Sequence, residues 1–244
     1  MIDRTIDITT RDGKMSTFIT HPETGGPHPV VIVYMDAPGI REELRDFAHR
    51  IGTVGYYTML PQLFYRTGGQ SYPMVEHRTP EQTKHMQDTM AGISNGMIVE
   101  DTRALLELAK GDKAAKAGIK GCIGYCMSGQ YVLTVAGTFP DEFRAIVSLH
   151  GVRHVTDKPD SPHKLVPKLK GEQYFGFAET DPHVPEAEVK ALRQTLKEHR
   201  SNALVEIHPG TEHGFVFPGR KAYHKHESER AWERTFSLFR RVLG

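Results

Sequence analysis

The stretch of sequence that decides the fold reads Ile119-Lys120-Gly121-Cys122-Ile123-Gly124-Tyr125-Cys126-Met127-Ser128-Gly129-Gln130. The apolar residues before Cys126 predict a buried strand, and the apolar run from Tyr131 to Ala136 predicts a helix. Gly124 and Ser128, two residues to either side of Cys126, are small. A strand–turn–helix elbow needs small residues there because the chain passes close to a nucleophile whose backbone is strained. The stretch therefore predicts a nucleophile elbow with Cys126 at its tip.

A cysteine at the tip of such an elbow is expected to be reactive. Cys126 would lie at the N-terminus of a helix that begins near Met127, where unpaired N–H groups and the helix dipole favour a thiolate. The N–H of Met127 would point to the place where an oxyanion develops during acyl transfer. The alternative is a buried structural cysteine, since free cysteine is among the most buried residue types. Cys122 fits that alternative well, whereas the small neighbours of Cys126 favour a catalytic role.

Composition favours one globular α/β domain over residues 1–244. The length suits a single large domain, and 38% hydrophobic with 25% charged residues is ordinary for a soluble protein. A net charge of +1 without a basic block predicts no binding to nucleic acid or to a membrane surface. The run Val30 to Met35 is too short to cross a bilayer, and the N-terminus resembles no secretion signal. Because Cys122 and Cys126 form no disulfide framework, we predict a reduced, cytoplasmic protein.

No metal site is expected, although the chain contains 14 histidines. His150 and His154 have the spacing of helical ligands, but Gly151 and the strand predicted before it argue against a helix. His224 and His226 are two residues apart on a predicted helix and would point to different faces. The histidine spacings therefore do not converge on a zinc site.

The rest of the chain alternates predicted strands with predicted helices. Ile2 to Thr9 and Met15 to Thr20, on either side of a turn, predict an N-terminal antiparallel hairpin. Val30 to Met35 is a continuous apolar run, which is typical of a parallel strand buried on both faces. Further strands are predicted at 56–60, 119–124, 143–149, 172–177 and 203–208, and helices at 41–54, 80–90, 94–110, 127–138, 185–199 and 221–242. This alternation indicates a mostly parallel central sheet with helices on both faces.

Three polar loops follow three of the later predicted strands and carry Cys126, Asp181 and His213. The order nucleophile, acid, histidine is that of α/β-hydrolases. His213 would accept the thiol proton and later donate it to the leaving group, and Asp181 would fix the imidazole tautomer and stabilise the imidazolium. Alone, Asp181 could be a turn residue before Pro182, and His213 could be a surface histidine. Together, the three residues predict a catalytic triad.

The chain resembles the dienelactone hydrolase family (carboxymethylenebutenolidase-like) over most of its length. The motifs that carry the resemblance are Met35-Asp36-Ala37-Pro38-Gly39, Gly55-Tyr56-Tyr57, Leu60-Pro61-Gln62-Leu63-Phe64-Tyr65, Gly124-Tyr125-Cys126-Met127-Ser128-Gly129, Asp181-Pro182-His183-Val184-Pro185 and Glu212-His213-Gly214-Phe215. A cysteine in place of the usual serine is the mark of this family. The resemblance implies a single-domain α/β-hydrolase fold with a Cys-His-Asp triad and no cofactor.

Two more residues acquire expected roles from the resemblance. The best-known members of the family carry Glu at the position of Asp36, where it holds the resting thiol and helps to form the thiolate when substrate binds. Asp36 is one methylene shorter, so this assistance would be weaker or mediated by water; the alternative is that Asp36 only caps a loop. Ala37 would supply the second N–H to the oxyanion, beside that of Met127.

The resemblance also bears on the substrate. Members that cleave dienelactone hold its carboxylate with arginines, one of them four residues after the catalytic histidine, where this chain has Phe217. Another arginine lies before the helix predicted at 94–110, where Arg78 or Lys84 could substitute, unless these are solvated surface charges. Without a bidentate arginine, strong carboxylate recognition is lost, so a dienelactone carboxylate is not the expected substrate. The aromatic residues expected to line a more apolar pocket, or else to belong to the core, are Tyr65, Tyr125, Phe215 and Phe217.

The sequence thus predicts a hydrolase of lactones or small carboxylic esters that forms an acyl thioester on Cys126. Its partner would be the small-molecule substrate, and the chain would be a monomer or a weak homodimer. If His213 is the base, kcat/KM is expected to fall at mildly acid pH. Two alternatives remain: an α/β-hydrolase scaffold used as a ligand-binding or signalling module with little turnover, and a thioesterase or peptidase.

Overall fold

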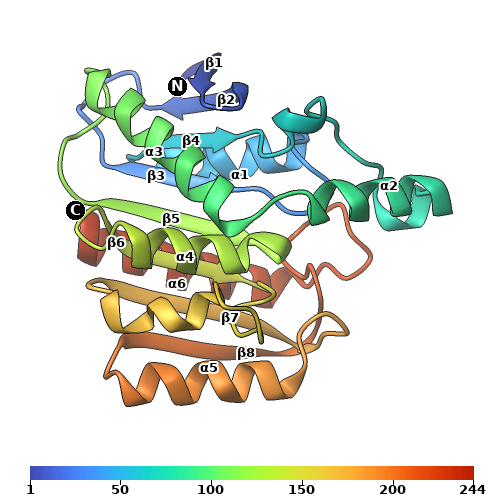
Figure 1. The fold of residues 1–244 in the computed structure, drawn as a ribbon. Helices are drawn as coiled ribbons and strands as arrows, with labels where there is room; N and C mark the ends of the chain where they lie inside the picture. Colours follow the sequence, from blue (N-terminus) through green and yellow to red (C-terminus); the bar gives the residue numbers. More distant parts are fainter. The chain divides into compact units, whose positions relative to one another are not determined.

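The computed structural model describes residues 1–244, apart from the side chain of Val75. The chain divides into two compact units, an amino-terminal unit, Met1–Ala117, and a carboxyl-terminal unit, Gly118–Gly244. In Figure 1 the first unit runs from blue to green and the second from green to red. That residues 1–244 form a single domain stays a prediction.

The amino-terminal unit is built on strands in the order β1-β2-β4-β3. β1 and β2 form the predicted antiparallel hairpin, whose turn places Gly13 at a φ of 140°, a conformation that side chains rarely adopt. β2 pairs antiparallel with β4, and β4 pairs parallel with β3. The strands are β1 (Ile2–Thr10), β2 (Gly13–His21), β3 (Val30–Tyr34) and β4 (Tyr57–Pro61). The hairpin and the buried parallel strand are therefore confirmed.

Two helices of this unit begin where their sequences provide caps. Thr79 accepts a hydrogen bond from the N–H of Gln82 in a capping box, with Pro80 in the first turn, and Ser94 accepts one from the N–H of Met97. One face of the first helix is buried and packs on β2 and β4. The helices are α1 (Glu42–Thr53), α2 (Pro80–Ala91) and α3 (Asn95–Gly111), with 3₁₀ turns at Tyr65–Thr67 and Val75–His77.

The carboxyl-terminal unit contains four parallel strands in the order β5-β6-β7-β8. They are β5 (Lys120–Tyr125), β6 (Phe143–Leu149), β7 (Glu172–Thr180) and β8 (Asn202–Glu212). Every residue of β5 is buried, as expected for a parallel strand covered on both faces. The last two strands run beyond their predicted ends at 177 and 208, because the edge pairing of β7 and β8 continues as far as Thr180 and Glu212.

Helices cover both faces of β5, as predicted. A Cβ added to Gly121 would lie 3.0 Å from Leu243 of α6, whereas one added to Gly124 would lie 2.7 Å from Val132 of α4. Because side chains three residues apart on a strand point to opposite faces, α4 and α6 lie on opposite faces (Figure 1). The helices are α4 (Gly129–Thr138), α5 (Glu186–Glu198) and α6 (Lys225–Leu243), with 3₁₀ segments at Cys126–Ser128 and Pro162–Lys168.

Two predicted helix starts were wrong. The helix expected from Met127 begins as a 3₁₀ turn, and α4 proper starts at Gly129, because the elbow needs a tighter turn than an α-helix provides. The helix expected from Lys221 starts at Lys225, where the ring of His224 accepts a hydrogen bond from the N–H of Glu227 and caps the helix. Among the described residues, no helix combines the length and the hydropathy that crossing a membrane requires.

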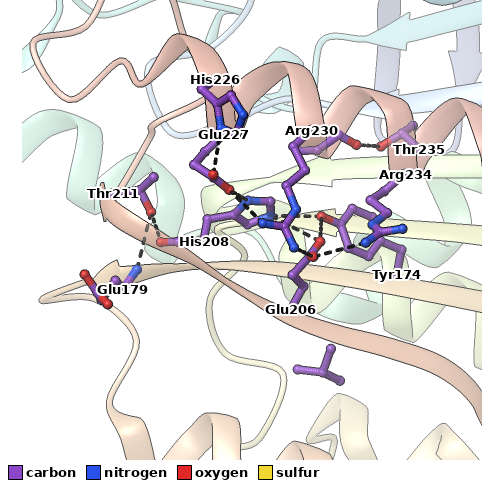
Figure 2. A network of polar contacts seen from close by, with 12 residues as sticks. Tyr174, Glu179, Glu206, His208, Thr211, His226, Glu227, Arg230, Arg234 and Thr235 are labelled. Carbon is purple, nitrogen blue, oxygen red and sulfur yellow. Dashed lines mark hydrogen bonds and ion pairs between the residues drawn. The ribbon is translucent and has the colours of Figure 1, made fainter.

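A buried polar network joins β7, β8 and α6 (Figure 2). His208 is fully buried; its Nδ1 lies 2.8 Å from Oε2 of Glu227, and its Nε2 lies 2.8 Å from the hydroxyl of Tyr174. Tyr174 donates to Glu206 at 3.0 Å, and Arg230 binds the other oxygen of Glu206 at 2.5 Å. Each buried polar group of the network thus has a partner, which offsets the cost of removing it from water.

Candidate active site

Cys126 has the backbone of a nucleophile elbow. Its φ is 51°, in the left-handed region, directly after the end of β5. A Cβ on Gly124 would lie 2.7 Å from the carbonyl oxygen of Ser128, so only glycine fits there. Cys126 is half-buried, whereas Cys122 is buried, and burial raises the pKa of the Cys122 thiol. The structure therefore separates an accessible cysteine from an inert structural one.

Strand pairing explains how residues distant in sequence come to lie together. Tyr125 of β5 pairs with Leu149 of β6, so Cys126 and His150 follow the ends of neighbouring parallel strands. Thr180 of β7 pairs with Glu212 of β8, so Asp181 and His213 likewise emerge side by side. Parallel strands end at one edge of a sheet, and that edge is where α/β proteins bind ligands.

Asp181 and His213 form the contact that their positions predict. Nδ1 of His213 donates a hydrogen bond to Oδ2 of Asp181 at 2.7 Å, and the carboxylate side chain is almost wholly buried. The other oxygen, Oδ1, accepts the backbone N–H of His183 at 2.9 Å. These two bonds fix the carboxylate and leave Nε2 as the ring nitrogen of His213 that is available for chemistry.

Cys126 acts on His213 electrostatically. Burial by itself would lower the pKa of His213, but the negative charge of the Cys126 sulfur and the hydrogen bond with Asp181 together raise the pKa to about 10. A negative charge close to an imidazole favours its ionised form. The imidazolium form of His213 is thus stabilised beside the sulfur. The structure brings Cys126, His213 and Asp181 together.

Two further histidines, to which the sequence assigned no part in catalysis, pack against the ring of His213. The ring of His183 lies edge-on at 4.7 Å between centroids, and that of His150 at 4.9 Å. Burial lowers the pKa of His183, and the charge of His213 lowers it further, against the opposing effect of Asp181. The signal that could have identified His150 and His183 is their place in the sequence, because each lies in the loop that follows a predicted strand.

Three of the four aromatic residues expected to line an apolar pocket lie in the core. Tyr125, Phe215 and Phe217 are fully buried. Phe217 lies 5.4 Å from Tyr125 and 5.5 Å from His150, and Phe215 lies 5.9 Å from His150, all between ring centroids. These rings pack around His150, which in turn contacts His213. The contact of Tyr125, Phe215 and Phe217 with a substrate stays a prediction.

Asp36 and Ala37 belong to the amino-terminal unit, where they follow β3 and Met35 and are buried. Nη1 of Arg41 lies 2.6 Å from Oδ1 of Asp36, and Nη2 lies 3.2 Å from Oδ2, so the pair is bidentate. Arg41 also binds Glu43 at 2.8 Å. The pKa of Arg41 is raised because these carboxylates outweigh its burial. The sequence did not indicate this partner of Asp36; the roles in assisting catalysis and in binding an oxyanion stay predictions.

The remaining predicted substrate contacts are engaged in bonds of their own. The hydroxyl of Tyr65 bonds Thr10 at 2.7 Å and Asp101 at 2.8 Å. Arg78 donates to the carbonyl oxygen of Pro73 at 2.7 Å and 3.0 Å, and Lys84 pairs with Asp88 at 2.6 Å along α2. In the part of the chain that the structure describes, no group of three or more His, Cys, Asp or Glu side chains is arranged to hold a metal ion.

Known proteins are similar to this chain over almost all of its length. A protein of Synechocystis sp. with the provisional name carboxymethylenebutenolidase is 25% identical over 241 residues, which cover 98% of this chain and 96% of that protein. Its namesake from Escherichia coli K12 is 24% identical and covers 97% of this chain and 86% of its own length.

Solved structures share the fold. A crystal structure from Klebsiella pneumoniae, provisionally named dienelactone hydrolase, has a TM-score of 0.86 and 23% identity and covers 98% of both chains. A dienelactone hydrolase-like promiscuous phosphotriesterase from metagenomic libraries has a TM-score of 0.81 and 18% identity, with 99% of this chain and 98% of that one covered. The sequence model of the dienelactone hydrolase family matches residues 15–243. The chain therefore belongs to the dienelactone hydrolase family, a family of α/β-hydrolases.

Proposed function

We propose that this hydrolase cleaves lactones or small carboxylic esters through an acyl thioester on Cys126, with His213 and Asp181 completing the triad. The observation that carries the proposal is the contact of His213 with Asp181 at 2.7 Å together with the raised pKa that Cys126 and Asp181 impose on the imidazole. A left-handed Cys126 at the end of β5 is the supporting feature.

The first half of the reaction transfers the acyl group to sulfur. The Cys126 thiolate attacks the carbonyl carbon, and the C=O electron pair moves onto oxygen, where the backbone N–H of Met127 is the proposed donor. Collapse of this intermediate breaks the C–O bond. The imidazolium of His213 gives its Nε2 proton to the leaving alkoxide, so a thioester, an alcohol and a neutral imidazole result. In a lactone the alcohol stays attached to the acyl group.

The second half consumes one water molecule. Neutral His213 accepts a proton from water through Nε2 while the water oxygen attacks the thioester carbonyl. The C–S bond breaks, the thiolate returns, and the carboxylic acid leaves. His213 is again an imidazolium held by Asp181, so the free enzyme is restored and one ester bond has been hydrolysed. Asp181 keeps its charge throughout and stabilises the imidazolium.

The decisive experiment compares Cys126→Ala with Cys122→Ala, a matched control in which the buried cysteine of the same strand is replaced. Both are assayed with p-nitrophenyl acetate, a simple butenolide and a dienelactone. Cys126→Ala is expected to lose roughly 10³-fold or more in kcat, and Cys122→Ala to retain activity to the extent that it stays folded. Mass spectrometry of a rapidly quenched reaction should find the acyl group on Cys126 in the wild type.

Three outcomes would contradict the proposed hydrolysis of esters through Cys126. Equal activity of wild type and Cys126→Ala would exclude the cysteine mechanism. Stoichiometric acylation of Cys126 without turnover would support a ligand-binding or signalling module. Turnover confined to added acyl thioesters or peptides would identify a thioesterase or a peptidase.

A further inference from the structure

The loop that follows β6 rests directly on the nucleophile elbow. The backbone N–H of Val152 donates a hydrogen bond to the carbonyl oxygen of Cys126 at 3.0 Å. Gly151 and Gly129 pack backbone to backbone, since a Cβ added to Gly129 would lie 2.5 Å from the Gly151 Cα. Main-chain contacts therefore set the position of the next residue, Arg153, relative to the nucleophile.

The residue after Arg153 is anchored as well. His154 is fully buried; its Nε2 lies 2.9 Å from the hydroxyl of Ser148, and its backbone N–H donates to Glu188 at 2.7 Å. Between these anchors Arg153 has a φ of 60°, in the left-handed region. Such a conformation is strained for a non-glycine residue and persists only where the surroundings impose it, often at functional sites.

The guanidinium of Arg153 has no partner among the described residues. Its side chain is exposed, and no described residue forms an ion pair or a hydrogen bond with it. Glu188, the carboxylate beside this loop, bonds the backbone of His154 instead. By contrast, Arg41 and Arg230 are paired with carboxylates. Arg153 therefore presents an uncompensated cation on a rigid loop.

The charges of Arg153 and Cys126 both act on the hydroxyl of Tyr131. Tyr131, in the first turn of α4, is buried, and burial raises the pKa of its phenol. The positive charge of Arg153 opposes that rise, and the negative charge of Cys126 adds to it. The loop after β6 and the nucleophile elbow thus bring both charges to bear on one buried hydroxyl of α4.

We propose that Arg153 binds a carboxylate of the substrate and gives the enzyme a preference for esters or lactones that carry one. This inference rests on the proposed function. The planar fork of a guanidinium matches the two oxygens of a carboxylate, a recognition that Lys reproduces only in part. Arg78 and Lys84, which the sequence suggested for this role, make the bonds described above with Pro73 and Asp88. Carboxylate recognition would thus come from the loop after β6.

The test uses two substrates that differ in one charge: mono-p-nitrophenyl succinate and its methyl ester. The measured quantity is the ratio of kcat/KM for the acid to kcat/KM for the methyl ester. In Arg153→Met and Arg153→Gln this ratio is expected to fall by about 10- to 100-fold, the loss of a charge-assisted contact, mainly through KM. Arg153→Lys keeps the charge without the fork and should give an intermediate ratio.

Arg200→Met is the matched control. Arg200 is also exposed and left-handed, with a φ of 51°, but it precedes β8 and so lies at the amino-terminal edge of the strands, away from Cys126. Its substitution should leave the ratio as it is in the wild type. Two results would overturn the proposal. A ratio that stays at the wild-type value in Arg153→Met and Arg153→Gln would show that Arg153 is only a solvated arginine. An equal fall in kcat/KM for both substrates would show that Arg153 has a structural role.

A second readout separates this proposal from the hydrolase mechanism. Iodoacetate and iodoacetamide alkylate a cysteine without turnover and differ in the same charge. The ratio of their rates at Cys126 is expected to fall by about tenfold in Arg153→Met and to stay constant in Arg200→Met. If ester hydrolysis is absent while this ratio falls, the hydrolase mechanism fails and anion binding by Arg153 stands. If hydrolysis proceeds and the ratio does not fall, the role of Arg153 fails alone.

Discussion

The left-handed backbone of Cys126 is the conformation on which the proposed chemistry depends. A φ of 51° costs a cysteine roughly 1–3 kcal/mol, so neighbouring contacts have to hold it. The close approach of Gly124 to Ser128 and the hydrogen bond from Val152 to the Cys126 carbonyl oxygen provide them. The same contacts keep the thiol at the end of β5, half-buried and within reach of His213.

The raised pKa of His213 predicts the pH dependence of acylation. The imidazolium persists until the pH approaches about 10, so the proton for the leaving group is available over the neutral range. kcat/KM for an alkyl ester is expected to fall as the pH rises through that value. A p-nitrophenyl ester, whose leaving group needs no proton, should keep its kcat/KM to higher pH. Rates of ethyl and p-nitrophenyl acetate hydrolysis, corrected for the uncatalysed reaction, measure the difference.

The variant Asp181→Asn tests whether His213 is responsible for this pH dependence. Loss of the carboxylate removes a hydrogen bond and a charge that raise the pKa of His213, so the alkaline limb should move to lower pH. An alkaline limb at the same pH in both proteins would show that His213 is not the titrating acid. The fall at mildly acid pH expected from an ordinary histidine is no longer predicted, because an imidazole with a pKa near 10 is already protonated there.

At the scale of elements, the contact between α4 and the loop after β6 depends on two glycines. A Cβ on Gly129 would lie 2.5 Å from the Cα of Gly151 and 2.7 Å from the N of Val152, and neither backbone atom can move freely. Gly129→Ala is therefore expected to lower the free energy of unfolding by about 1–3 kcal/mol and to reduce kcat by displacing the elbow. Denaturant unfolding and p-nitrophenyl acetate hydrolysis measure the two effects.

Gly111→Ala serves as the control for this prediction. Gly111 is the last residue of α3, and a Cβ added there would meet no atom within 4 Å. Alanine loses less backbone entropy on folding than glycine, so this variant should match or exceed the wild type by up to about 1 kcal/mol. If the two variants had equal stability, the backbone contact at Gly129 would not be as tight as the structure indicates.

At the scale of the whole molecule, charged groups of the carboxyl-terminal unit give its stability a defined dependence on pH. Burial lowers the pKa of His208 from its ordinary value of 6.5, so protonation costs more in the folded state and stability falls as the pH drops below 6.5. Glu206 and Glu227 have pKa values below their ordinary 4.5, against the effect of burial, because Tyr174, His208 and Arg230 stabilise their charges. Their contribution is lost at still lower pH.

The contribution of His213 to stability depends on pH in the opposite direction to that of His208. Because its folded pKa is raised to about 10, its contribution to stability is complete below 6.5 and is lost as the pH rises to about 10. Stability should therefore be greatest near neutral or slightly acid pH and decline on both sides. His208→Gln, which keeps hydrogen-bonding groups but cannot be protonated, is expected to flatten the decline of Tm just below pH 6.5.

His199→Gln is the control for His208→Gln. His199 is exposed at the end of α5, so its substitution should leave the pH dependence of Tm as it is in the wild type. Thermal unfolding of the wild type, His208→Gln and His199→Gln at pH values above and below 6.5 measures this dependence. Parallel curves for wild type and His208→Gln would show that the buried network does not control acid stability.

Local sequence by itself determined the elbow and the strands, and it indicated the three residues that are proposed as a triad. A tight turn between an apolar strand and a helix needs Gly124 and Ser128 around Cys126, and this requirement is visible within a few residues. The order of Cys126, Asp181 and His213 after successive strands indicated their common edge, and the family match over residues 15–243 agrees with the hydrolase prediction.

Only the tertiary structure decided which other side chains lie beside Cys126, Asp181 and His213. His150 lies beside Cys126, and His183 against His213, because parallel strands far apart in the chain pair in one register, and no local pattern encodes that register. The pairing of Asp36 with Arg41 and the exposed position of Arg153 depend on loop conformations, φ among them, that sequence periodicity does not specify. Apolar spacing determines which segments are buried, whereas the neighbours of a polar side chain depend on how those segments meet.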